Sequence, residues 1–223
     1  IQLADWGPPE EVIRAALAPL AEEQNTAFAI GLATLMQKAT SPGTVALVAA
    51  GLSDRAGSIA DAAVDDWLDK ARIILPTENL IEAANFAEAF RNAFQDLENA
   101  PPSRNSKRAE RLVQLRQDAE ESLRLAYEQG LEAEIFRQIP LLCRAASPDQ
   151  IANLESQARA LRRIELIGRR FGMDHGYDGA AKRILMAIGE AKQRLTPDGL
   201  TKLDLARMAE ILLGPDMALD VLD

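Results

Sequence analysis

Apolar side chains recur every three or four residues along most of the chain, and no segment alternates apolar and polar side chains like a half-buried strand. This spacing places apolar side chains on one face of an α-helix. We therefore expect an all-α fold of nine to ten helices, packed as an irregular bundle or as a curved array of antiparallel helical hairpins. The main predicted helices cover about residues 8–22, 25–39, 42–52, 58–75, 77–98, 107–139, 148–171 and 197–213, with others after residues 178 and 214.

Capping residues indicate where these helices begin and end. Ser147, followed by a proline and by Gln150, has the composition of a capping box, in which two side chains bond to the free backbone N–H groups of a first turn. Ser58 with Asp61 three residues later predicts the start of a second helix in the same way. Pro140 predicts the end of the long helix over 107–139, since proline lacks the N–H group that a helix interior needs.

The charge of the chain is unevenly distributed. The net charge is −9, and residues 1–98 account for all of it with 15 acidic and 6 basic side chains, whereas residues 99–223 carry 19 of each. Between the two lies a segment rich in proline, asparagine and serine, a composition typical of a loop. We predict an acidic helical part over 1–98, a linker over 99–106 and a neutral helical part over 107–223, which could also form one continuous domain.

The segment Asp65-Asp66-Trp67-Leu68-Asp69 resembles the Asp-Asp-x-x-Asp motif of all-helical prenyl and terpene synthases. The resemblance covers five residues and implies a site in which Asp65, Asp66 and Asp69 bind magnesium and a diphosphate. On a helical wheel, however, these aspartates lie opposite the apolar side chains that must face the core. We therefore expect a solvent-exposed acidic face, no metal ion and no cofactor. A carboxylate- and magnesium-dependent enzyme acting on a diphosphate remains the alternative.

A stripe of arginines follows one side of the predicted helix over 148–171. It consists of Arg159, Arg162, Arg163, Arg169 and Arg170. Guanidinium groups bind carboxylates or phosphates in pairs of hydrogen bonds. We hypothesise that the stripe binds the acidic face formed by Asp61, Asp65 and Asp69, within one chain or between two copies. Pairing inside its own helix is an equal alternative, and binding to the phosphates of nucleic acid or anionic lipid is a weaker one, because the net charge is negative.

Catalytic side chains are scarce. The chain has one histidine, His175, and one cysteine, Cys143, and nothing near Cys143 in the sequence indicates an activated thiol. We interpret the glycine-rich segment over 171–179 as a tight connection between two helices. Phe86, Phe90 and Phe94, spaced four residues apart, indicate a helix in the core.

These observations favour a non-enzymatic protein–protein interaction or scaffolding domain of a larger protein, with charged helix faces as its binding surfaces. An arginine-to-lysine ratio of 19 to 6 and abundant alanine suggest a bacterial source. We expect a cytoplasmic location, no membrane span and no nucleic-acid partner. Because the first residue is Ile1, we also expect the native N-terminus to be missing.

Overall fold

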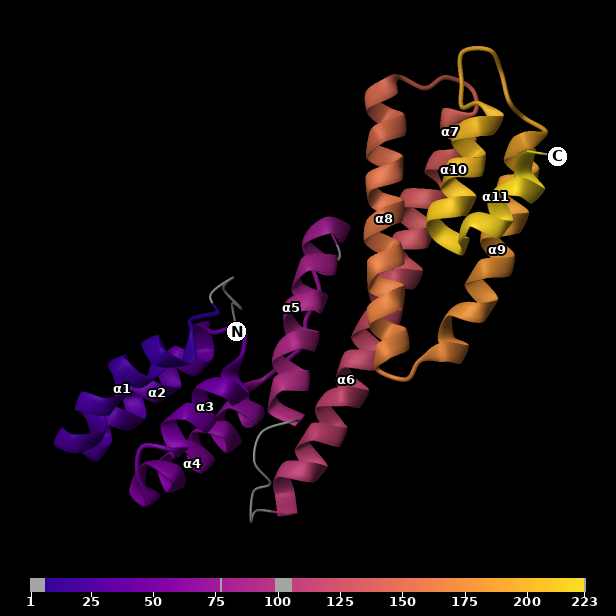
Figure 1. Cartoon of the computed structure of the whole chain (residues 1–223). Coiled ribbons are helices and arrows are strands. Elements are labelled where there is room, and N and C mark those ends of the chain that lie inside the picture. Colours follow the sequence, from indigo (N-terminus) through magenta and orange to yellow (C-terminus); the bar gives the residue numbers. More distant parts are fainter. Residues whose placement is uncertain (1–6, 77, 99–105, 223) are drawn as a thin grey trace. The chain divides into compact units, whose positions relative to one another are not determined.

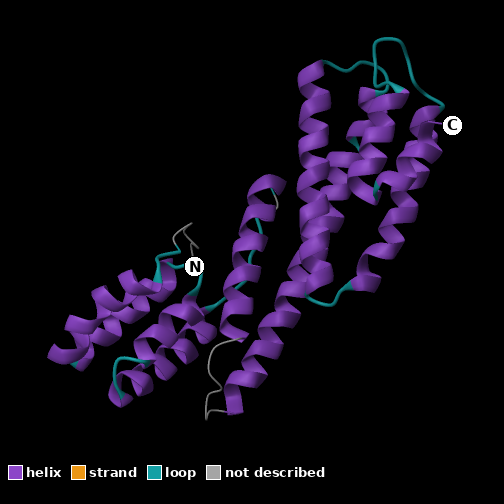
Figure 2. Ribbon diagram, viewed as in Figure 1, coloured by secondary structure: helices purple, strands orange, loops and turns teal. Residues whose placement is uncertain are grey.

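The computed structural model describes residues 7–76, 78–98 and 106–222, without the side chains at 23, 106 and 174–176 (Figures 1 and 2). These residues form helices and no strand, which confirms the predicted all-α fold. The predicted linker falls outside them except for the backbone of Ser106. The helices are α1 (Glu10–Glu23), α2 (Asn25–Lys38), α3 (Pro42–Ala50), α4 (Asp54–Lys70), α5 (Leu80–Glu98), α6 (Ser106–Gly130), the π-helix η1 (Leu131–Phe136), α7 (Gln138–Leu142), α8 (Pro148–Arg170), α9 (Asp174–Lys192), α10 (Lys202–Leu213) and α11 (Pro215–Leu222).

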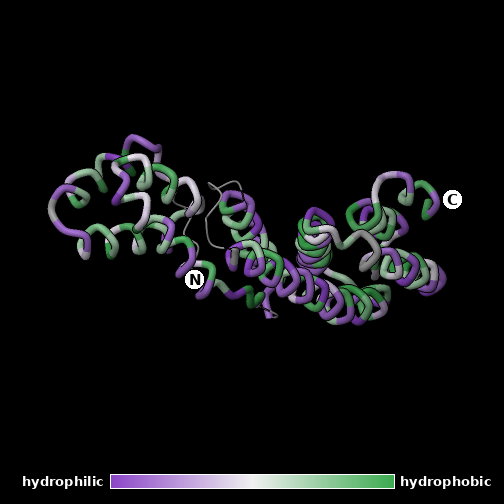
Figure 3. The backbone as a smooth tube through the Cα atoms, turned by 90° about the horizontal axis from the view of Figure 1, so that it is seen from below, coloured by the Kyte–Doolittle hydropathy of each residue, from purple (hydrophilic) through white to green (hydrophobic). Residues whose placement is uncertain are grey.

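The contacts between residues divide the chain into two compact units, each with its own core. Of the described residues, unit 1 contains 7–73, 88–98 and 106–119, and unit 2 contains 74–76, 78–87 and 120–222. Thus α5 and α6 are each divided between the two units. Figure 3 shows hydrophobic and hydrophilic segments alternating along the helices, which is the periodicity that predicted them.

In unit 1, the end of α5 packs against the start of α3. The carboxylate of Asp96 accepts hydrogen bonds from the backbone N–H of Thr44 at 2.9 Å and from its hydroxyl at 2.7 Å. An acidic side chain is favourable there, because the first turn of a helix has unpaired N–H groups. Gly43 allows the close approach: a Cβ atom at Gly43 would lie 2.5 Å from the carbonyl oxygen of Asp96. Phe90 and Phe94 are buried nearby, with ring centroids 6.2 Å apart.

The bounds of α4 differ from the prediction. Ser53, rather than Ser58, caps its N-terminus, and its hydroxyl oxygen accepts a hydrogen bond from the N–H of Ala56. The helix ends at Lys70 instead of continuing to Leu75, and Ile74, which lies beyond that end, is 79% exposed. The buried face of α4 includes Trp67, within the Asp-Asp-x-x-Asp segment.

The long helix formed by α6, η1 and α7 runs further than predicted, because Pro140 does not end it. Counted as one helix, these three segments bring the described residues to ten helices. The π-helical segment bonds the N–H of Arg137 to the carbonyl of Glu132, five residues earlier. It ends at Phe136, the residue whose carbonyl stands four positions before Pro140 and would otherwise clash with the proline ring.

The end of α7 is capped by the loop between α9 and α10. The N–H of Leu200 donates to the backbone carbonyl of Leu142 at 3.0 Å, and the hydroxyl of Thr196 donates to the backbone carbonyl of Cys143 at 3.0 Å. These bonds satisfy carbonyl groups that have no partner inside the helix. Gly199 lies so close that its Cβ would be 2.1 Å from the Cys143 carbonyl oxygen. The loop therefore fixes the end of α7 beside α9 in unit 2.

Helix α8 begins as predicted. Ser147 and Gln150 form the capping box, with the Gln150 N–H donating to Ser147 and the Ser147 N–H donating to the Gln150 side chain. Gly172, with a φ of 104°, ends the α8 segment in a backbone conformation that favours glycine. The next helix begins at Asp174, four residues earlier than predicted.

Candidate functional site

The acidic face predicted on α4 contacts the first turns of α6 within unit 1. The guanidinium of Arg108 donates to the Asp65 carboxylate at 2.9 Å and lies 3.5 Å from Asp61. Arg111 pairs with Asp69 at 2.6 Å. Arg108 is buried, so it needs these carboxylates, since an unpaired buried charge is costly. The face thus connects two helices of unit 1.

The aspartates of the Asp-Asp-x-x-Asp motif are each bonded to a different cation. Asp65 pairs with Arg108, Asp69 with Arg111, and Asp66 with Lys70 at 2.7 Å on the exposed side of α4. Among the residues that the structure describes, no three His, Cys, Asp or Glu side chains gather as metal ligands would.

The arginine stripe lies on α8 in unit 2, and four of its members have contacts there. Arg159 pairs with Glu155 at 2.8 Å, and Arg163 donates to Asn85 at 2.9 Å. Arg162 and Arg169 both pair with the buried Glu165, at 2.6 and 2.8 Å. The fifth member, Arg170, is exposed.

The two charged faces thus belong to different units, and each has ion-pair partners within its own unit. The hypothesis that the faces bind each other, in one chain or between copies, stays a prediction.

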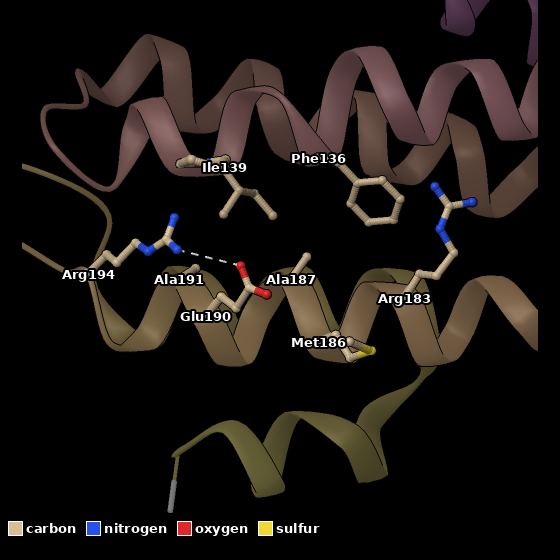
Figure 4. A pocket seen from close by; sticks show the side chains of 9 residues that line it. Phe136, Ile139, Arg183, Met186, Ala187, Glu190, Ala191 and Arg194 are labelled. Atoms are coloured by element: carbon tan, nitrogen blue, oxygen red, sulfur yellow. Dashed lines mark ion pairs between the residues drawn. The ribbon is translucent and has the colours of Figure 1, made fainter.

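The sequence did not reveal a groove between η1–α7 and α9 in unit 2. It has a volume of about 300 Å³, at the lower end of the range for pockets that hold small ligands. Figure 4 shows Phe136 and Ile139 pointing toward α9, with Arg183 and Arg194 at opposite ends. The lining residues are Phe136, Ile139, Pro140, Arg183, Met186, Ala187, Glu190, Ala191 and Arg194.

The groove combines an apolar floor with positive ends. Arg183 stacks over the ring of Phe136, with 4.9 Å to the centroid, and lies 3.3 Å from Glu132. At the other end, Arg194 lies 3.7 Å from Glu190. These ion pairs are exposed, so water competes for them and they contribute little stability. Met186 is 59% exposed, and its flexible side chain is suited to contact with apolar partners.

Neither the groove nor its surroundings contain an activated nucleophile among the described residues. The thiol of Cys143 is buried and points to the carbonyl of Ala191 at 3.8 Å. Burial raises the pKa of this thiol, and the positive charge of Arg194 only partly offsets that effect. A raised pKa keeps the thiol protonated and unreactive at neutral pH. The side chain of His175 lies outside the described residues.

In the part of the chain that the structure describes, no helix combines the length and the apolar character needed to cross a bilayer. Comparison with protein-family models, curated proteins and solved structures finds no match to this chain.

Proposed function

We propose that this chain is a non-enzymatic protein-interaction domain whose groove between η1–α7 and α9 binds an amphipathic helix of a partner protein. The observation that supports the proposal is the apolar lining between two arginines, in which Phe136 is half-buried and Met186 is 59% exposed. Apolar side chains exposed together in a concave site are typical of binding surfaces. We expect the domain to belong to a larger protein of the bacterial cytoplasm.

The charges of the groove indicate the chemistry of the partner. Arg183 lies on α9 and Arg194 lies in the turn just beyond its last residue, Lys192, so the two arginines stand eleven residues apart in the sequence. Each arginine has one carboxylate beside it, Glu132 for Arg183 and Glu190 for Arg194, in exposed ion pairs that the carboxylates of a partner can replace. A partner helix of about three turns, with apolar anchors in the middle and acidic residues in its first and last turns, complements this pattern.

Two synthetic peptides test the proposal. Both form an amphipathic helix with leucines at three- and four-residue spacing, and they differ only in carrying glutamates or lysines in the terminal turns. We expect the glutamate peptide to bind at least about tenfold more tightly, with an affinity that falls as salt is added. Fluorescence anisotropy measures both dissociation constants.

A pair of variants shows whether the groove is the binding site. Met186→Asp places a charge on the apolar floor and should abolish binding. Leu203→Asp is the matched control, because Leu203 is 62% exposed on α10 and does not line the groove. Equal affinities for the two peptides, or undiminished binding by Met186→Asp, would rule out the proposed function.

A further inference from the structure

The last helix of unit 2, α11, has an apolar strip on its exposed side. The helix packs against α10, and Val221 is its buried side chain (Figure 1). On the exposed side, Leu219 is 66% exposed and Leu222 is 44% exposed. These leucines follow the exposed Pro215 by four and seven residues, so the three side chains lie along one side of the helix. This helix contributes no residue to the groove between η1–α7 and α9 of its own chain.

The charges of α11 are all negative. Asp216 in its first turn and Asp220 in its last turn are exposed, and the helix has no basic residue. The two aspartates stand four residues apart and therefore lie on the same side of the helix, beside the apolar strip. Neither aspartate forms an ion pair with another residue that the structure describes. Their carboxylates are therefore available to the cations of another molecule.

The length of α11 matches that of the groove. Its eight residues extend over about 12 Å at 1.5 Å per residue. The part of α9 that lines the groove, from Arg183 to Ala191, also extends over about 12 Å. Arg194 lies in the turn beyond α9, but its guanidinium reaches back to within 3.7 Å of Glu190. A helix with exposed leucines and with acids in its first and last turns complements an apolar lining between two arginines.

Building on the proposed function, we propose that the helix bound by the groove is α11 of a second copy of this chain. The apolar strip of α11 packs against Phe136 and Met186 of the other copy. The two aspartates of α11 replace the exposed carboxylates that pair with Arg183 and Arg194. The helix remains packed on its own α10, because only its exposed side takes part in the contact.

This contact joins two different surfaces, so every copy of the chain carries both halves of it. Two turns of helix bury little area, and we expect a weak association with a Kd of about 10–100 µM. Sedimentation velocity of the full chain measures the association. The weight-average mass should rise with concentration, over a range from about tenfold below to about tenfold above this Kd.

Two variants each remove one half of the contact. Leu219→Asp places a charge in the apolar strip of α11, and Met186→Asp places a charge in the groove. We expect each variant alone to associate at least about tenfold more weakly than the wild type. A mixture of the two should associate again, because Leu219→Asp keeps an intact groove and Met186→Asp keeps an intact α11. Leu125→Asp, at a 46% exposed position on α6, is the matched control and should associate as the wild type does.

Three results would overturn the proposal. One is a wild type that remains monomeric over the whole range of concentration. Another is association that Met186→Asp or Leu219→Asp leaves unchanged, and the third is a mixture of the two variants that associates no more than either alone. The proposed function is tested separately: a monomeric wild type that binds the glutamate peptide retains the groove as a site for a helix of another protein.

Discussion

Tyr177 combines a buried ring with a hydroxyl that the described residues leave unpaired. In the unfolded chain this hydroxyl would titrate near its usual pKa of about 10. In the folded protein, burial and the nearby Glu165 raise the pKa. Between the unfolded and the folded pKa the folded protein binds the proton and the unfolded chain releases it. The contribution of the protonated Tyr177 to the stability of the folded protein is therefore fully present below about pH 10 and is lost as the pH rises above that value.

We predict that the free energy of unfolding falls with increasing pH above about 10, by up to about 1.4 kcal/mol per pH unit for each buried tyrosine. Tyr177→Phe should show a shallower decrease, because Tyr127 is then the only one of the two tyrosines with a raised pKa that remains. Urea unfolding of both proteins at several pH values between 8 and 11 measures the difference. Parallel curves for the two proteins would contradict this assignment.

At the scale of helices, α8 and α9 approach closely because α8 has a glycine where the Tyr177 ring crosses it. A Cβ at Gly168 would lie 2.0 Å from the Tyr177 hydroxyl oxygen, whereas a Cβ at Gly189 in α9 would meet nothing within 4 Å. Both glycines lie inside helices, so alanine at either position brings the same gain in helix propensity. The two positions differ in packing alone.

We predict opposite effects of the two alanine substitutions. Gly189→Ala should stabilise the protein by up to about 1 kcal/mol. Gly168→Ala should destabilise it by about 1–3 kcal/mol, because the ring of Tyr177 must move. Combining Gly168→Ala with Tyr177→Phe should recover part of the loss, since the closest atom is the hydroxyl oxygen. Chemical denaturation of the four variants gives these values, and equal stabilities of the two single variants would refute the close packing.

Across the whole molecule, two hydrophobic cores divide the described residues into two units. Phe94 is buried in unit 1 and Leu161 in unit 2, each almost completely. Because α5 and α6 contribute residues to both cores, the sequence order of the helices does not correspond to the units. A cavity in one core should therefore destabilise the helices of that unit rather than one half of the sequence.

We predict that Leu161→Ala costs about 2–5 kcal/mol and Phe94→Ala about 3–5 kcal/mol. Amide hydrogen exchange followed by mass spectrometry should localise the two effects. Leu161→Ala should accelerate exchange in α8 to α10 and leave α1 to α4 unchanged, and Phe94→Ala should do the reverse. Uniform acceleration over all helices in either variant would show a single cooperative core.

Local sequence signals predicted the helical class and several of the helix bounds. Apolar spacing gave the all-α class, and the capping box at Ser147 gave the start of α8, because both act within one or two helical turns. They failed at individual helix ends. Ser53 caps α4 in place of Ser58, and a π-helical segment carries the chain past Pro140.

The candidate sites depended on tertiary structure. The arginines that pair with the acidic face of α4 follow it by about forty residues, and the sequence does not state which cation meets which aspartate. The groove combines side chains of η1, α7 and α9, and the ring of Tyr127 in α6 packs against that of Tyr177 in α9. The sequence by itself determined which side of each helix is apolar, since that is periodicity within one segment. Only packing decided which faces meet and which hydroxyl remains unpaired, because these depend on distances between segments that no local pattern encodes.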